Sequence, residues 1–257
     1  MNIFRNLIKY RYLIRVLVTR DIKIKYRRSV FGVLWSILNP LLMMIITSMV
    51  FSTLFRFDLP NYILYLLVGQ VVFTFFSEST NFAMWSILGN ASLLKKVYVP
   101  KYLFPLSRVL SSCVNLIFTI PAVLVMMVYT GASISYLLMS MLFPILSLLI
   151  FCIGVGLALS ALVVYFRDIA HFYAVLLTGL NYATPIFYPE AIVPEEYKVL
   201  LFFNPLYYYL KMFRQVIWQG NIPDMQLMLL CSFMSLFALL IGGVVFKRAQ
   251  NQFILYM

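Results

Sequence analysis

The chain has 257 residues, of which 63% are hydrophobic and only 11% are charged. A soluble globular domain carries about 25% charged residues, and a chain this apolar would expose large aggregating patches in water, so lipid suits most of it as a solvent. The net charge of +12 comes from 20 Lys and Arg against 8 Asp and Glu. These basic residues flank apolar runs instead of forming one patch, which argues against nucleic-acid binding and is typical of cytoplasmic segments beside a membrane.

The chain shows no sign of a metal centre or of a disulfide framework. Its three cysteines, Cys113, Cys152 and Cys231, each lie inside an apolar stretch, at spacings that match no metal motif. The single histidine, His171, cannot build a histidine metal site alone. The first 33 residues carry nine Lys and Arg and no short apolar core, so we expect no cleavable signal peptide.

Residues 1–18 have the apolar spacing of an amphipathic helix. Five apolar residues recur at intervals of three and four and share one helical face, namely Ile3, Leu7, Tyr10, Ile14 and Leu17. This pattern predicts a helix lying in the membrane interface, and the alternative is an ordinary surface helix. Residues 20–33 are too charged to span, so we expect an interface helix and elbow over 1–33.

Six apolar stretches follow, and they predict an all-α polytopic membrane protein with a single transmembrane domain over 1–257. The expected spans are about 34–55, 62–86, 106–129, 136–165, 170–188 and 226–246. The fourth is long enough to tilt or to enclose a kink near Gly154 and Gly156. Residues 189–224 hold apolar pieces too short to cross a bilayer, which fits short re-entrant or interfacial helices.

The distribution of positive charge predicts the topology. Sixteen of the twenty Lys and Arg lie in the N-terminal segment, the 88–108 connection, the 166–171 turn and the C-terminal tail. By the positive-inside rule both termini and these two connections are cytoplasmic, and residues 189–224 face outward. No internal repeat is visible, so the sequence does not support an inverted-repeat carrier.

No motif for ATP hydrolysis or for another enzymatic reaction is present. The chain lacks GxxxxGKS/T, HExxH, GxSxG and CxxC patterns, so energy for uphill transport must come from an ion gradient or from another subunit. Glu78 is the only acid well inside a span. It is either an ion site or a structural group bonded between helices, and we favour the structural role because proton coupling usually involves more than one acid.

Aromatic residues gather in the first span and around the fifth. Aromatic rings stack on the C–H faces of sugars, so a sugar pathway is one interpretation, and helix packing with interfacial belts is the other. The candidates for lining a channel are Phe51, Phe55, Phe172, Tyr173, Tyr182, Phe187 and Tyr188.

Five segments stand out as motifs: RDIKIKYRRSVFGVLWSILNPLLMM (20–44), GNASLLKKVYVPKYLFPL (89–106), YFRDIAHF (165–172), TPIFYP (184–189) and NPLYYYLKMFR (204–214). They resemble signatures of the permease subunits of ABC-2 type polysaccharide and teichoic-acid exporters. The matches recur in order across nearly the whole chain, and together they are specific for the family but weak for the substrate.

The resemblance implies a homodimer in the bacterial cytoplasmic membrane, with two copies of a separate ATPase subunit. ATP and Mg would bind that partner, and no cofactor is expected on this chain. In the family the N-terminal helix and the loop after the second span contact the ATPase, and the FRD turn lies near it. The candidate coupling residues are Asn90, Leu93, Leu94, Lys95, Lys96, Val97, Tyr98, Pro100, Lys101, Arg167 and Asp168.

The implied substrate is a polymer on a polyprenyl-diphosphate carrier, which leaves O-antigen, capsule and teichoic acid open. Basic residues at the cytoplasmic side can attract the diphosphate, or they can set topology and bind anionic lipid at ~1 kcal/mol each. A permease for small hydrophobic compounds and a non-transport membrane scaffold are the alternative functions. The candidate diphosphate residues are Arg5, Lys9, Lys23, Lys25, Arg27 and Arg28.

Overall fold

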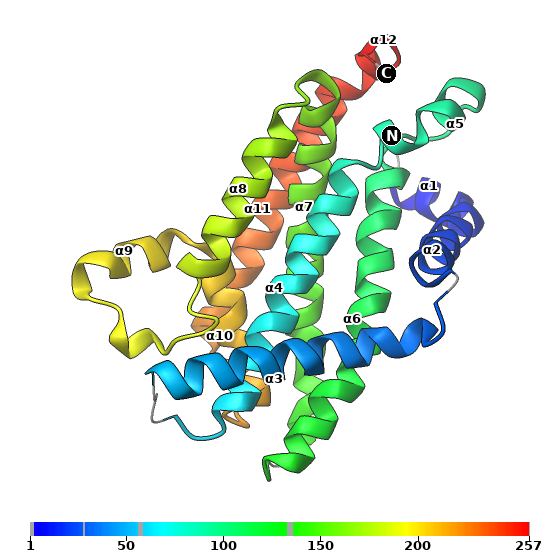
Figure 1. Cartoon of the computed structure of the whole chain (residues 1–257). Coiled ribbons are helices and arrows are strands. Elements are labelled where there is room, and N and C mark those ends of the chain that lie inside the picture. The colour runs from blue at the N-terminus through cyan, green and yellow to red at the C-terminus, as the bar shows by residue number, and fades with distance from the viewer. Residues whose placement is uncertain (1–2, 28, 56–58, 133–135, 257) are drawn as a thin grey trace.

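The computed structural model describes residues 3–27, 29–55, 59–132 and 136–256, and within these ranges the regular structure is entirely helical. Five helical segments are long and apolar enough to cross a membrane (Figure 1). They centre on α3 (Trp35–Phe55), α4 (Tyr62–Met84), α6 (Leu103–Tyr129), α7 (Leu142–Tyr165) and α11 (Met225–Ala249). Their bounds lie within a few residues of the expected spans.

The fifth expected span coincides with α8 (Ile169–Ala183), which has only 15 residues. A helix needs about 20 residues to cross the hydrocarbon core, so α8 alone is short for a crossing. The five long helices are therefore confirmed, and the sixth crossing stays a prediction.

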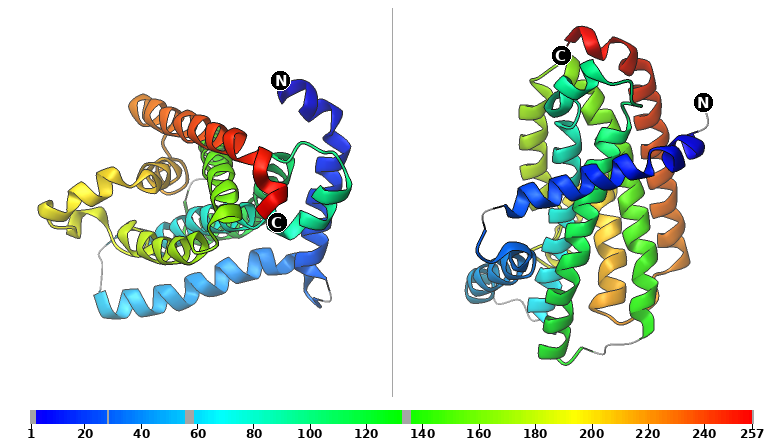
Figure 2. Two further views of the ribbon diagram at one scale, coloured as in Figure 1. Left: turned by 90° about the horizontal axis from the view of Figure 1, so that it is seen from above. Right: turned by 90° about the vertical axis from the view of Figure 1, so that its right-hand side faces the viewer.

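The N-terminal segment is more helical than its charge suggested. A short α1 (Ile3–Lys9) leads into α2 (Arg11–Tyr26), which continues through the charged stretch that we expected to form an elbow. The bend comes later, at Gly32, whose φ of 51° suits glycine. A 3₁₀ turn (Gly32–Leu34) then enters α3. Figure 2 shows α2 lying across the long helices, and it packs on α6.

Helices α7 and α11 approach each other more closely than side chains would allow. A Cβ atom on Gly154 would lie 2.3 Å from the backbone carbon of Ala238, and one on Gly242 would lie 2.0 Å from the Gly154 oxygen. Small residues let membrane helices reach backbone contact in this way. Helix α7 is continuous through Gly154 and Gly156, so these glycines serve close packing.

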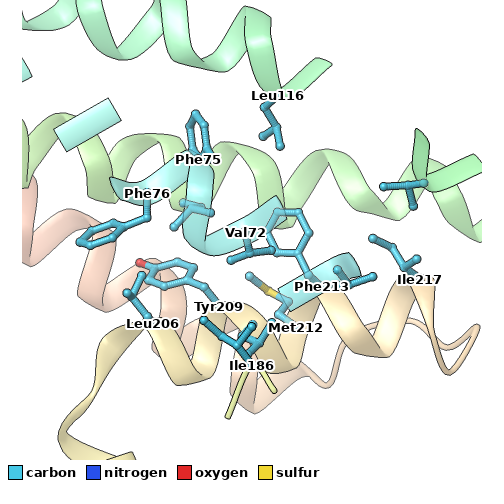
Figure 3. Packing of buried hydrophobic residues seen from close by; sticks show 14 of the residues in the cluster. Val72, Phe75, Phe76, Leu116, Ile186, Leu206, Tyr209, Met212, Phe213 and Ile217 are labelled. Atoms are coloured by element: carbon cyan, nitrogen blue, oxygen red, sulfur yellow. The ribbon is translucent and has the colours of Figure 1, made fainter. Parts of the chain in front are cut away.

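The segment 189–224 contains two short helices, as expected. After a 3₁₀ turn (Glu190–Ile192), α9 (Glu195–Phe203) has 9 residues and α10 (Pro205–Ile217) has 13. The Asn204 side chain caps α10 by accepting from the Leu206 amide at 3.0 Å, and a proline occupies the first helical position. Figure 3 shows Tyr209 and Phe213 of α10 packed toward Val72 of α4, so α10 belongs to the core.

One end of the helix bundle collects several elements that are distant in sequence. The 3₁₀ turn Leu88–Asn90 and α5 (Ala91–Lys96) lie there with the α7–α8 turn, the 3₁₀ turn Gln250–Gln252 and α12 (Phe253–Tyr256) (Figure 1). Helix α1 is drawn toward the same end (Figure 1). We call it the α5 end. The opposite end contains the connection from α6 through the 3₁₀ turn Tyr136–Met141 to α7.

Candidate functional site

Residues 90–101, here called the coupling segment, are anchored at one point and exposed at another. Leu94 is buried in an apolar cluster with Leu17 of α2, Phe104 of α6 and Phe253 of α12. Beyond α5 the chain becomes extended, and Tyr98 is 99% exposed. The segment therefore has a buried base against the bundle and an exposed tip.

Asn90, which was predicted to couple to another subunit, is buried and joins the coupling segment to α2. Its Oδ1 accepts from Nη1 of Arg20 at 3.0 Å, and its Nδ2 donates to the Ser86 carbonyl at 2.7 Å. The segment is thus hydrogen-bonded directly to α2.

An acid that sequence reasoning overlooked lies at the centre of this junction. Asp21 is 8% exposed, and its Oδ1 lies 3.1 Å from Nη2 of Arg20 and 3.1 Å from Nη1 of Arg108. Ser111 donates to Oδ2 at 3.4 Å. A buried carboxylate needs such partners to offset its desolvation. The available signal was that Asp21 is the only acid among nine cations in the first 33 residues.

A second ion pair ties α2 to α4. Nζ of Lys25 lies 3.0 Å and 3.1 Å from the two carboxylate oxygens of Glu78, and both side chains are about one-third exposed. Lys25 is thus the partner of Glu78, and no local sequence pattern could identify it because the two residues are 53 positions apart. It favours the structural interpretation of Glu78 and places one predicted diphosphate residue in a protein contact.

A cavity of about 450 Å³ lies beside this pair, mainly between α3, α4 and α6. Most of its surface is apolar, and we call it the polar cavity because of the polar side chains that interrupt this surface. Nε2 of Gln70 donates to Thr47 at 2.7 Å. The buried Oε1 of Gln70 and Oγ of Ser112 have no hydrogen-bond partner within the described residues. Such unpaired polar atoms can bond water or a polar ligand. The polar lining includes Lys25, Ser36, Asn39, Thr47, Gln70, Thr74, Glu78, Ser112, Asn115, Thr119 and Asn181.

Four of the other basic residues predicted to attract a diphosphate are exposed, namely Arg5 and Lys9 on α1, Lys23 on α2 and Arg27 just after it. Lys23 and Arg27 line an open groove of about 790 Å³ along α2, together with Arg15 and Arg20. Arg28 lies outside the described residues.

Four of the predicted channel aromatics meet where α3 approaches the loop after α8. The rings of Phe51 and Phe187 are stacked, with centroids 5.1 Å apart. Tyr182 is tilted against Phe187 at 6.3 Å, and the Tyr188 hydroxyl donates to the Tyr182 carbonyl at 2.8 Å. Phe187 also lines the polar cavity. Aromatic and polar surfaces are therefore continuous here.

The remaining predicted aromatics lie elsewhere. Tyr173 is buried, and its hydroxyl donates to Oγ1 of Thr80 at 2.5 Å, which is a packing position between α8 and α4. Phe172 is 76% exposed on the same helix. The side chain of Phe55 lies outside the described residues.

Arg214, the last residue of the 204–214 motif, is only 7% exposed. Its guanidinium lies 3.4 Å from the centre of the Tyr65 ring. Its Nη atoms donate to the carbonyls of Pro185 at 2.8 Å and Ile186 at 3.2 Å. Arg214 thus fastens the 184–189 loop to α4 and α10, through the planar contacts that an arginine makes best.

The FRD turn places Arg167 and Asp168 on the surface at the α5 end, as Figure 1 shows for the α7–α8 connection. The Asp168 carbonyl accepts from the His171 amide at 3.0 Å, which starts α8. Among the described residues, no group of three or more His, Cys, Asp or Glu could hold a metal ion.

Comparison with known proteins identifies the family. The family model described as ABC-2 type transporter matches residues 12–218, most of the chain. The chain belongs to the ABC-2 type transporter family. The family expected from the five motifs is therefore confirmed.

Named relatives extend over almost the same length. An O-antigen export system permease protein RfbA of Klebsiella pneumoniae is 30% identical, over 94% of this chain and 93% of its own. The RfbA of Myxococcus xanthus is 29% identical over 98% of both chains. The polysialic acid transport protein KpsM of Escherichia coli is 23% identical over 93% of both.

Proposed function

We propose that this chain is the permease subunit of an ATP-driven exporter that moves a lipid-linked cell-surface polysaccharide across the cytoplasmic membrane. The relatives named for O-antigen export and polysialic acid transport align over more than nine-tenths of the chain, which supports this substrate class. O-antigen, capsule and teichoic acid types are all included. Permeases of this family are transport components, and the hydrolysis of ATP belongs to a partner subunit.

The observation that carries the proposal is the construction of the α5 end. A coupling segment with an exposed tip is joined through Asn90 and Arg20 to α2, and α2 is joined through Lys25 and Glu78 to α4. Force applied at the tip therefore has a short mechanical route to the helices that line the polar cavity. An ATPase subunit on the cytoplasmic side, with ATP and Mg bound to it, is the partner that this route serves.

We infer six crossings with both termini in the cytoplasm. At 1.5 Å per residue the 15 residues of α8 extend about 22 Å, and the 184–189 loop completes the crossing. Non-helical backbone is tolerated at membrane depth only where protein covers it, and the contacts of Arg214 with this loop meet that condition. Helices α9 and α10 then re-enter from the outer side. The surplus of Lys and Arg at the α5 end supports a cytoplasmic position for that end.

The pathway that we propose lies at the interface of a homodimer and includes the polar cavity with the aromatic group Phe51, Tyr182, Phe187 and Tyr188. Amide and hydroxyl groups can replace the hydration of a sugar, while aromatic rings cover its apolar faces. The exposed cations Lys23 and Arg27 are the candidates for the diphosphate. The polyprenyl tail can remain in lipid while the polar head enters.

The test is the ATPase activity of the complex with its ATPase subunit in lipid nanodiscs. We expect stimulation by at least one lipid-linked O-antigen, capsular or teichoic-acid glycan and none by small hydrophobic drugs. Stimulation by drugs alone would support the permease for small hydrophobic compounds instead. Hydrolysis by the permease alone would overturn the proposal.

The coupling segment is tested by introducing charge at its tip. We expect Val97→Glu and Tyr98→Glu to leave membrane insertion intact and to separate ATP hydrolysis from export. Ser92→Glu is the matched control, because Ser92 is exposed on the same segment but lies in the first turn of α5. Equal coupling in all three variants would remove the assignment.

A further inference from the structure

The C-terminal residues fold back onto the bundle instead of leaving it. After α11 the chain turns through Gln250–Gln252 into α12, which contacts both α5 and α7. Phe253 is fully buried, with its ring centroid 5.4 Å from that of Phe246. It shares an apolar cluster with Leu94, the anchor of the coupling segment. The tail therefore packs directly against that segment.

Lys101, the last residue of the coupling segment, also contacts the C-terminal residues Gln250 and Phe253. Its Nζ donates to the Gln250 carbonyl at 2.6 Å and lies 5.5 Å from the centre of the Phe253 ring. Burial lowers the pKa of the Lys101 ammonium group. A partly buried lysine that donates to one carbonyl and faces one aromatic ring makes a more specific contact than a fully solvated surface charge.

The tail is held by α7 as well. The Tyr165 hydroxyl donates to the Ala249 carbonyl at 2.6 Å, and its ring centroid lies 4.8 Å from that of Tyr256. Tyr165 ends α7, directly before the FRD turn. The tail thus connects the coupling segment to α7 and α11, two helices that are in backbone contact with each other.

We propose that residues 249–256 form a brace that fixes the coupling segment relative to α7 and α11. Phe253 and Lys101 are its positioning residues. With the brace in place, displacement of the tip moves helices of the bundle, whereas without it the same displacement is absorbed by local bending of the segment. The part of this inference that concerns transmission from an ATPase rests on the proposed function. The part that concerns the position of the coupling segment relative to α7 and α11 does not rest on the proposed function.

The positional part is tested on the permease alone in nanodiscs, with the native cysteines replaced and spin labels at Tyr98→Cys and Val244→Cys. Tyr98 is the exposed tip, and Val244 is 49% exposed on α11. With the labelled permease diluted into unlabelled permease, electron–electron double resonance should give one narrow distance distribution for this parent. Phe253→Ala should broaden it. Leu255→Ala, at a residue of the same helix that is 81% exposed, is the matched control and should not.

Lys101 provides a second variant that leaves the apolar cluster untouched and therefore keeps the test informative if Phe253→Ala fails to insert. Lys101→Met should broaden the distribution, and Lys101→Arg should keep it narrow because a donor and a cation remain. A narrow distribution in both Phe253→Ala and Lys101→Met overturns the brace, whatever the substrate is.

The transmission part uses the same variants in the complex with the ATPase subunit. We expect the amount of glycan exported per ATP hydrolysed to fall several-fold in Phe253→Ala and Lys101→Met at equal membrane levels of the protein. It should stay unchanged in Leu255→Ala and Lys101→Arg. A broadened distance distribution with normal export per ATP would overturn the transmission role and leave the proposed function intact.

Discussion

Replacing Asp21 by alanine tests whether the buried ion cluster holds α2 on the bundle. The substitution removes the only acid of the cluster and leaves the guanidinium groups of Arg20 and Arg108 facing each other. The Asp21 side chain is 5% exposed, the Arg108 side chain 27% and the Arg20 side chain 37%. The aspartate thus lies in the least hydrated position and cannot be replaced by water without rearrangement.

The expected loss follows from these exposures. Removing one partner of a buried ion pair costs about 3–5 kcal/mol. Because Arg20 can turn toward water, we expect Asp21→Ala to fall near the lower bound, about 3 kcal/mol. Asp21→Asn retains an acceptor and most of the volume, so it should lose only about 1–3 kcal/mol.

The assay is the free energy of unfolding in mixed micelles titrated with dodecyl sulfate, together with tryptic cleavage within α2. The control is Glu195→Ala, which removes a 2.5 Å ion pair with Lys198 in which Glu195 is 85% exposed, and it should cost less than about 1 kcal/mol. The double variant Asp21→Ala with Arg108→Met should recover part of the loss. If Asp21→Ala costs no more than Glu195→Ala, the reasoning about burial is wrong.

Three further predictions use the same unfolding assay. Gly154→Ala should destabilise the protein by at least about 1–3 kcal/mol, because its methyl group would collide with the α11 backbone. Gly243→Ala is the control: its methyl group would meet nothing within 4 Å, so it should be neutral or slightly stabilising. Equal effects of the two substitutions would contradict the close packing of α7 on α11. Lys25→Glu should cost up to about 1 kcal/mol, and adding Glu78→Lys should restore stability if the two side chains interact in the membrane. Arg214→Lys should loosen the 184–189 loop, because lysine cannot stack on Tyr65 and donate to two carbonyls from one plane. Proteolysis within this loop should therefore increase. Unchanged proteolysis would argue against the role of Arg214 in holding the loop.

The positions of the long helices could be predicted from hydropathy because the same physical requirement applies along the whole span. Backbone groups in hydrocarbon must bond within the segment, so a long apolar run is a helix. The spans expected at 62–86 and 226–246 correspond to helices α4 (Tyr62–Met84) and α11 (Met225–Ala249). The exception is α8, where the apolar run to residue 188 includes a loop that Arg214 covers.

The charged stretch after residue 18 is a segment whose structure could not be predicted from its neighbours in the sequence. Its composition suggested an elbow, yet α2 continues to Tyr26. The partners that allow this are far along the chain, since Arg20 bonds to Asn90 and Lys25 to Glu78, 70 and 53 positions away. Nothing within α2 identifies them.

The sequence by itself determined the solvent of this protein, its long helices and its family. Hydropathy, charge and motifs are read along the chain, and each of these properties depends on neighbours in that order. Only the tertiary structure decided that Asp21 is neutralised by Arg108, that Gly154 admits the backbone of α11, and that Phe253 lies beneath the coupling segment. These contacts depend on distances between helices, and such distances arise only when the apolar faces have packed together.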